Sequence, residues 1–187
     1  STNDNKIRWY KNDGQANPSF TAHVITDQAD GAYSVYAADV DGDGDMDVLS
    51  ASYLDNTIRW YENNGAESFT AHEITTSATG ARSVYAADVD GDGDMDVLSA
   101  SWNDKKIAWY ENNGASNPTF TAHTITTSAD AANYVYAADV DGDGDIDVLS
   151  ASYNDDKIAW YENDGSESFT AHTITTSADA ARFVYAA

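Results

Sequence analysis

The sequence predicts an all-β fold, a β-propeller of four-stranded antiparallel blades, with close to four blades in this chain. Three observations lead to that prediction. The segment Val-Tyr-Ala-Ala-Asp-Val-Asp-Gly-Asp-Gly-Asp recurs with its valine at positions 35, 84 and 135, so each unit has about 50 residues. Each unit holds four short runs rich in β-branched and aromatic residues, and an Asn-Gly or Asp-Gly turn signal separates the last two runs. Repeats of this length and composition are typical of propeller blades.

The four strands expected in one complete unit are residues 34–40, 47–52, 57–63 and 69–76. Each run has the length of a strand and is too short for a helix. The first two strands carry small residues that suit a crowded centre, and the Trp-Tyr pair of the third strand suits the wider gap between diverging blades. The third and fourth strands lack clean alternation, which predicts that both faces of each sheet are covered. A β-solenoid is the alternative, but its coils are shorter and lack Asn-Gly hairpins.

The whole chain, residues 1–187, is expected to form a single repeat domain. Its predicted units are residues 1–34 (partial), 35–83, 84–134 and 135–183, and residues 184–187 open a further unit. Residues 39–87 and 139–187 are identical at 38 of 49 positions, which indicates either recent amplification or engineering. Four full units would need about 200 residues, and the 13-residue counterpart of residues 39–51 is absent from the fourth unit.

Composition excludes several classes of function. Nine basic and 32 acidic side chains give a net charge of −23, which argues against nucleic acid as a partner because phosphate binding needs clustered Lys and Arg. No apolar run approaches the roughly 18 residues of a spanning helix, so membrane insertion is not expected. The absence of cysteine removes disulfides and thiol nucleophiles. Binding of cations is the first function that such a charge suggests.

Each complete acidic loop reads Asp-Val-Asp-Gly-Asp-Gly-Asp-x-Asp and is predicted to bind one calcium ion. Calcium takes six to eight hard oxygen ligands, which such a loop can supply. We assign the side chains of positions 1, 3, 5 and 9 and the main-chain carbonyl of position 7, while glycine at positions 4 and 6 lets the backbone curl. The candidate metal ligands therefore come from five aspartates in each of three loops: Asp39, Asp41, Asp43, Asp45 and Asp47; Asp88, Asp90, Asp92, Asp94 and Asp96; Asp139, Asp141, Asp143, Asp145 and Asp147.

Three alternatives to a calcium site fit the loop less well. An EF-hand is excluded because position 12 is a serine (Ser50, Ser99 or Ser150) in place of glutamate, and because a strand follows the loop. Magnesium prefers to keep its waters and would resist so many protein ligands. A solvated acidic turn without metal is the remaining alternative, which the mutual repulsion of five neighbouring carboxylates disfavours.

The acidic loop followed by Val-Leu-Ser-Ala-Ser, in a unit that ends in Phe-Thr-Ala-His, resembles the FG-GAP-like or VCBS repeats of bacterial surface proteins. The resemblance covers essentially the whole chain. That family is similar to the calcium-binding blades of integrin α-subunit propellers and of some fungal and bacterial lectins, and it implies that loop positions 1, 3, 5, 7 and 9 are the ligands. Family propellers commonly have seven or eight blades. A homo-oligomer of two copies that completes a larger ring, a closed four-bladed ring and a part of a longer array all remain open.

Two further sets of residues are predicted to be structural. The four histidines lie on the outermost strand of each unit, too far apart for a shared metal site: His23, His72, His123 and His172. The Trp-Tyr pairs are expected to pack between blades rather than to stack on sugars. Trp102 differs, because it replaces Tyr53 and Tyr153 beside a loop, and it is the better candidate for a surface contact.

These observations favour a calcium-stabilised, non-catalytic module for binding, adhesion or structure. Because millimolar calcium is an extracellular condition, the expected location is secreted or on the cell surface. A lectin that holds glycans between blades is the alternative, and a protein ligand is also open. A polysaccharide-active enzyme is less favoured, because catalysis needs an asymmetric set of groups and the units repeat their histidines, Trp-Tyr pairs and aspartates. We therefore predict no catalytic residues.

Overall fold

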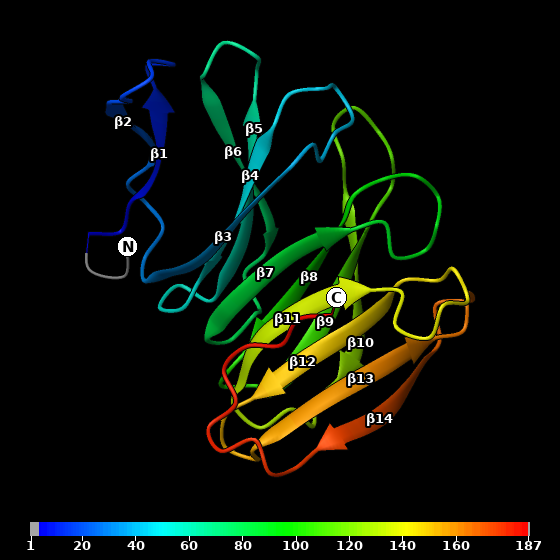
Figure 1. Ribbon diagram of the computed structural model, residues 1–187. Helices are drawn as coiled ribbons and strands as arrows, with labels where there is room; N and C mark the ends of the chain where they lie inside the picture. Colours follow the sequence, from blue (N-terminus) through cyan, green and yellow to red (C-terminus); the bar gives the residue numbers. More distant parts are fainter. Residues whose placement is uncertain (1–3, 187) are drawn as a thin grey trace.

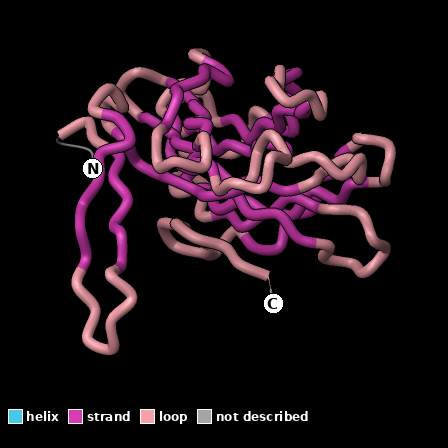
Figure 2. Tube along the Cα trace, turned by 90° about the horizontal axis from the view of Figure 1, so that it is seen from above, coloured by secondary structure: helices cyan, strands magenta, loops and turns pink. Residues whose placement is uncertain are grey.

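The computed structural model describes residues 4–186, and this part of the chain consists of strands and loops without a helix (Figure 2). Residues 4–186 accordingly contain no helix that could cross a membrane. The strands form one two-stranded and three four-stranded antiparallel sheets, which confirms the predicted all-β class. The first three residues of the predicted unit 1–34 and the last residue of the unit 184–187 lie outside the described residues.

Strand order within each four-stranded sheet follows the sequence. The two-stranded sheet consists of β1 (Ile7–Asn12) and β2 (Phe20–Thr26). The first blade consists of β3 (Ala32–Ala38), β4 (Asp47–Ser52), β5 (Thr57–Asn63) and β6 (Phe69–Thr75). The second blade consists of β7 (Ala81–Ala87), β8 (Asp96–Ser101), β9 (Lys106–Asn112) and β10 (Phe120–Thr126). The third blade consists of β11 (Ala132–Ala138), β12 (Asp147–Ser152), β13 (Lys157–Asn163) and β14 (Phe169–Thr175).

The blades fan out from their first strands, as in a propeller (Figure 1). Strand β7 lies against β3 on one side and β11 on the other, so the first strands form the inner edge of the fan. Equivalent tyrosines stack along this inner edge. The ring centroids of Tyr36 and Tyr85 are 4.6 Å apart, and those of Tyr85 and Tyr136 are 5.0 Å apart. Within residues 4–186 the sheets make an open fan rather than a closed ring.

The core lies between the blades, where large rings from one blade fill the space above small residues of the next. Trp60 of β5 is only 1% exposed and packs with Ala81, Ala86 and Tyr110 of the second blade. Trp109 is in the equivalent position between the second and third blades. The predicted role of these rings in packing between blades agrees with this arrangement.

Three details differ from the sequence-based expectations. The fourth strands contain no buried residue, so the prediction that both faces are covered is wrong there; neighbouring blades have diverged too far to cover them fully. The first strands begin two residues earlier than predicted, at Ala32, Ala81 and Ala132. The connection between β5 and β6 spans residues 64–68, a longer loop than the tight turn suggested by Asn-Gly, although Gly65 does adopt a positive φ of 72°.

Candidate metal centre

Each acidic loop joins the first strand of a blade to the second and brings three carboxylates together. One ligand atom from each carboxylate lies within 4.8 Å of the other two. Positions 1 and 3 belong to every cluster, joined by position 5 in the first loop and by position 9 in the other two. The clusters are Asp39, Asp41 and Asp43; Asp88, Asp90 and Asp96; and Asp139, Asp141 and Asp147.

Hydrogen bonds within each loop hold the backbone in a tight curl. In the second loop, Asp88 accepts hydrogen bonds from the amides of Gly91 (2.8 Å) and Gly93 (3.1 Å). Asp90 in turn accepts the amide of Asp92 at 3.2 Å. Gly91 and Gly93 have φ values of 77° and 98°, and nothing would obstruct a Cβ at either position. These glycines therefore serve the left-handed backbone and not a close contact, as predicted for positions 4 and 6.

The aspartate at position 9 is fully buried and ties the loop to the rest of its blade. In the second loop, Asp96 Oδ2 accepts the amide of Val89 at 3.0 Å, and Oδ1 accepts the amide of Asn112 at 2.7 Å. Burial raises the pKa of Asp96 to about 6, against the lowering effect of these hydrogen bonds. Burial likewise raises the pKa of Asp47 in the first loop. A carboxylate that is this poorly solvated is one that a bound cation would stabilise.

The aspartate at position 3 of each loop is also destabilised in its charged form. Burial, with further contributions from neighbouring carboxylates, raises the pKa of Asp41, Asp90 and Asp141. In the first loop Asp39 Oδ1 is buried and has no hydrogen-bond donor among the described residues. Clustered, partly desolvated oxygens with free lone pairs fit a hard divalent cation, so the three loops could each hold a metal ion.

The aspartate at position 7 behaves differently from its neighbours. The carboxylates of Asp45, Asp94 and Asp145 lie against Gly65, Gly114 and Gly165 in the hairpin of the same blade, where any Cβ would collide with them. None of the three belongs to a carboxylate cluster in the described chain. The side chain at position 7 is thus directed to the hairpin, and the main-chain carbonyl as a ligand stays a prediction.

A buried asparagine links neighbouring loops, and the sequence patterns did not predict this role. Asn112 at the end of β9 is 1% exposed, and its Nδ2 donates to the carbonyl of Val40 in the preceding blade's loop (2.8 Å) and of Met95 in its own loop (3.0 Å). Asn163 makes the equivalent contacts in the third blade. The signal available was the asparagine that follows every Trp-Tyr-Glu or Trp-Tyr-Lys, but its partners are about 70 residues away. We call this contact the asparagine clasp.

Each histidine packs against a tryptophan of the neighbouring strand, which agrees with a structural role. His72 stacks on Trp60 with ring centroids 4.4 Å apart, and its Nε2 lies 2.8 Å from Glu62 Oε2. The pairs Trp9–His23, Trp109–His123 and Trp160–His172 are stacked in the same way. No histidine belongs to a potential metal cluster within residues 4–186.

Trp102 lies far from the acidic loops, at the opposite end of the strands. It lines a cavity there with Arg82, Asn133 and Tyr153. The predicted surface-contact residue therefore lies in a cavity that is separate from the loops.

Comparison with known proteins places the chain in a family. The model of the FG-GAP-like repeat matches residues 1–50, 40–99, 88–150 and 139–187. No curated protein matches the chain. Among solved structures, a lectin of Agrocybe aegerita, described as recognising non-reducing terminal N-acetylglucosamine, is similar in fold, with a TM-score of 0.62 and 20% identity. The match covers 94% of this chain and 48% of the lectin, so the chain spans about half of that protein.

The V. cholerae biofilm matrix protein Bap1 is a weaker match, with a TM-score of 0.39 and 19% identity over 88% of this chain and 34% of Bap1. The family model, in contrast, accounts for all four repeats, and the three described four-stranded sheets have the blade arrangement that the repeats predict. The chain belongs to the FG-GAP-like repeat family.

Proposed function

We propose that the chain is a calcium-stabilised propeller segment that acts as a non-catalytic binding or adhesion module outside the cell. One observation carries the proposal: the loop carboxylates are clustered and partly buried, yet no Lys, Arg or His of residues 4–186 forms an ion pair with any of them. Buried charge is tolerated in proteins when it is paired or coordinates a metal. An external cation is the partner that fits.

Calcium is the cation that we assign to the loops. The side chains of positions 1, 3, 5 and 9 and the carbonyl of position 7 offer only oxygen, and calcium accepts many such ligands in flexible geometry. Magnesium requires near-ideal octahedral geometry and retains its waters, which suits a loop of this kind poorly. Residues that supply hard oxygens therefore support calcium in each of the three loops.

Calcium would stabilise the fold and would take no part in chemistry. Three ions would change the formal charge from −23 to −17, since each adds two positive charges. A ligand at 100 times its dissociation constant adds about 2.7 kcal/mol to the free energy of unfolding at each site. Through Asn112 and Asn163 the second and third blades are hydrogen-bonded to the loop of the preceding blade, so ordering a loop also supports the packing between blades.

Thermal unfolding tests the calcium proposal. We expect the melting temperature to fall by about 10 °C or more when EDTA replaces millimolar calcium, because the stability lost corresponds to several kcal/mol. Magnesium at the same concentration is the control and should restore little of the loss. An unchanged melting curve in EDTA, or equal rescue by magnesium, would overturn the proposal.

A binding role is supported by the family and by the structure. FG-GAP-like repeats extend over the whole chain, and a protein of similar fold is a lectin described as recognising non-reducing terminal N-acetylglucosamine, which supports a binding role. The repeats also place near-identical histidines, Trp-Tyr pairs and aspartates in every blade, which gives no asymmetric pair of acid and base. Calcium at millimolar concentration is available outside cells, which supports a secreted or surface location.

A further inference from the structure

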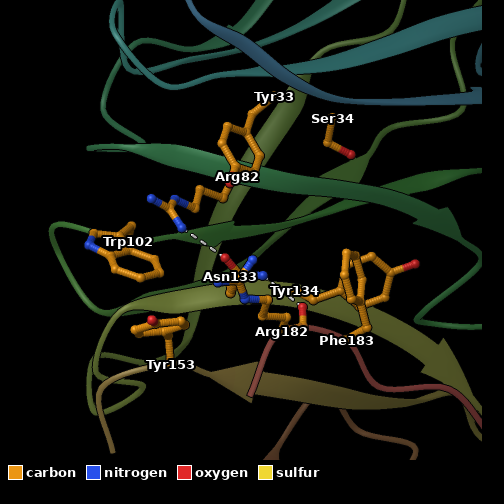
Figure 3. A pocket seen from close by; sticks show the side chains of 9 residues that line it. All are labelled: Tyr33, Ser34, Arg82, Trp102, Asn133, Tyr134, Tyr153, Arg182 and Phe183. Carbon is orange, nitrogen blue, oxygen red and sulfur yellow. Dashed lines mark hydrogen bonds between the residues drawn. The ribbon is translucent and has the colours of Figure 1, made fainter. Parts of the chain in front are cut away.

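A cavity of about 460 Å³ lies at the end of the inner strands that is remote from the acidic loops (Figure 3). Its size is within the range of small-molecule sites, roughly 300–1,000 Å³. Aromatic rings and two guanidinium groups dominate its wall. Its lining residues include Tyr33, Arg82, Trp102, Asn133, Tyr153 and Arg182.

The Arg82 side chain is fixed in this cavity by an aromatic ring and an amide, and it has no carboxylate partner in the described chain. Its guanidinium carbon lies 3.5 Å from the ring centroid of Trp102, and its Nη1 donates to Asn133 Oδ1 at 2.9 Å. Its Nε is buried and has no acceptor among residues 4–186. The second guanidinium, of Arg182, lies 5.5 Å from the ring centroid of Tyr153.

The lack of ion pairs at both arginines is unusual for a chain with 32 acidic side chains. Arg8 and Arg59 pair with Asp4 and Asp55 at 2.7 and 2.9 Å. Neither Arg82 nor Arg182 has a carboxylate within ion-pair distance in the described chain. The two arginines that remain available to an anion therefore line the same cavity.

The repeats diverge at this place. The second residue of β3, β7 and β11 is Tyr33, Arg82 and Asn133, and the equivalent residue after β14 is Arg182. The tyrosine three residues later is the same in all four units. If this residue had only a structural role, near-identical repeats would be expected to carry the same residue in each unit, and the cavity wall would be symmetric. The observed wall is asymmetric, and it combines cationic, amide and aromatic groups.

The acidic loops do not prevent an anion from binding here. Arg82 precedes Asp88 of the nearest loop by six residues along one strand, a separation of about 20 Å at 3.3 Å per residue. The Debye length is about 8 Å at physiological ionic strength, so the field of the loops is largely screened at the cavity. Asp104 and Asp155, two residues beyond Trp102 and Tyr153, are paired with Lys106 and Lys157 at 3.4 and 3.0 Å, so the two guanidinium groups are the charges of the cavity wall that have no ion pair in the described chain.

We propose that this cavity binds a carboxylated sugar unit of an acidic glycan. The Arg82 guanidinium, which lies on the Trp102 ring, suits the carboxylate because its planar donors match two carboxylate oxygens. The other aromatic rings of the wall, Tyr33 and Tyr153 among them, suit the apolar parts of a pyranose ring. The buried Asn133 accepts from Arg82 and donates to the carbonyl of Arg182 (2.7 Å), so it holds the Arg82 guanidinium in place. The inference rests on the proposed role as a binding module and names the ligand class of one site in it.

An NMR titration of the calcium-loaded chain tests this assignment. The probes are methyl α-glucuronide, methyl α-glucoside and acetate, which separate the carboxylated sugar from the neutral sugar and from the bare carboxylate. We expect the glucuronide alone to shift the indole N–H resonance of Trp102, assigned from Trp102→Phe. Arg82→Gln should weaken glucuronide binding by about tenfold or more. Arg59→Gln, which removes an ion-paired arginine away from the cavity, should leave it unchanged.

Several outcomes would overturn the inference. Equal binding of the glucoside would show that the carboxylate is not recognised, and equal binding of acetate would show that the sugar is not. Absence of any shift, or unchanged binding by the Arg82 variant, would exclude the site. The calcium dependence of melting in the same samples reports separately on the proposed module, since Arg82 lies outside the loops.

Discussion

Asp96 combines complete burial with two accepted hydrogen bonds and a pKa of about 6, well above the ordinary 3.8. In the folded state without metal, this group therefore binds a proton more tightly than in the unfolded chain. Asp41, Asp47, Asp90 and Asp141 shift in the same direction. Protons and calcium would thus compete for the same oxygens and relieve the same electrostatic cost.

The first prediction concerns pH. A carboxyl whose pKa is raised in the folded state costs stability above that pKa, and the cost disappears as the pH falls from about 6 towards about 4. For Asp96 alone the effect is on the order of 2–3 kcal/mol. In EDTA we expect a higher melting temperature at pH 5.5 than at pH 7.5, measured by circular dichroism. With calcium bound the order should reverse, and a metal-free protein that is more stable at pH 7.5 would contradict this interpretation.

The second prediction separates the two kinds of aspartate within one loop. Asp90 belongs to a carboxylate cluster, whereas the side chain of Asp94 lies against Gly114 in the hairpin. Asp90→Asn should therefore abolish measurable calcium binding at the second loop, so that calorimetry detects two sites in place of three. Asp94→Asn is the matched control, with the same change of charge, and should retain three sites. Equal losses in both variants would contradict the main-chain role of position 7.

At the scale of the structural elements, a loop that is followed by another blade, as the first and second loops are, is fixed by contacts from two directions. Its own blade contributes the amide at the end of the third strand, as Asn112 does for Asp96. The next blade contributes the side chain of the asparagine clasp, as Asn112 does for the carbonyl of Val40. One residue thus connects two neighbouring loops, and the stability of one site depends on the adjacent blade.

The third prediction is that the asparagine clasp provides much of the energetic coupling between a loop and the blade that follows it. Asn112→Ala removes two donors and leaves the buried carbonyl of Val40 without its partner, at a cost of about 2–4 kcal/mol. Chemical denaturation should show this loss, together with weaker calcium binding at the first loop, which holds Val40. Asn117→Ala alters an exposed asparagine in the loop that follows β9 and should cost less than about 1 kcal/mol. A similar loss in both variants would contradict the coupling.

The sequence was sufficient for the elements but not for the contacts between them. Strand β4 (Asp47–Ser52) and strand β5 (Thr57–Asn63) have the predicted bounds, because repetition and local composition determine them. The asparagine clasp joins residues more than 70 positions apart, and the cavity around Arg82 depends on which strand ends meet. The exposure of the fourth strands likewise follows from the divergence of the blades, which no local pattern encodes.

At the scale of the whole molecule, apolar residues that are buried between the blades are exposed at the two sides of the fan. Val84 and Val135 are 3% and 0% exposed because the preceding blade covers them, whereas the equivalent Val35 is 56% exposed. The β1–β2 pair lies beside the first blade but has no inner strand that could cover β3 (Figure 1). On the other side of the fan, Phe183 and Tyr185 are 73% and 74% exposed. Two apolar sides that differ from each other favour head-to-tail association.

The final prediction is that two copies of this chain associate through these sides. Each copy would cover Val35 with the side of its partner that carries Phe183 and Tyr185, so that inner strands continue from one copy to the next. Sedimentation in calcium should give the mass of a dimer, and in EDTA the dimer should weaken because the blades are less ordered. Val35→Lys should shift the protein to monomer, whereas Val24→Lys, at an equally exposed valine (55%) on the outer strand β2, should not. A calcium-loaded protein that stays monomeric at high concentration would contradict this arrangement, because Val35 would then remain exposed to solvent without a partner chain.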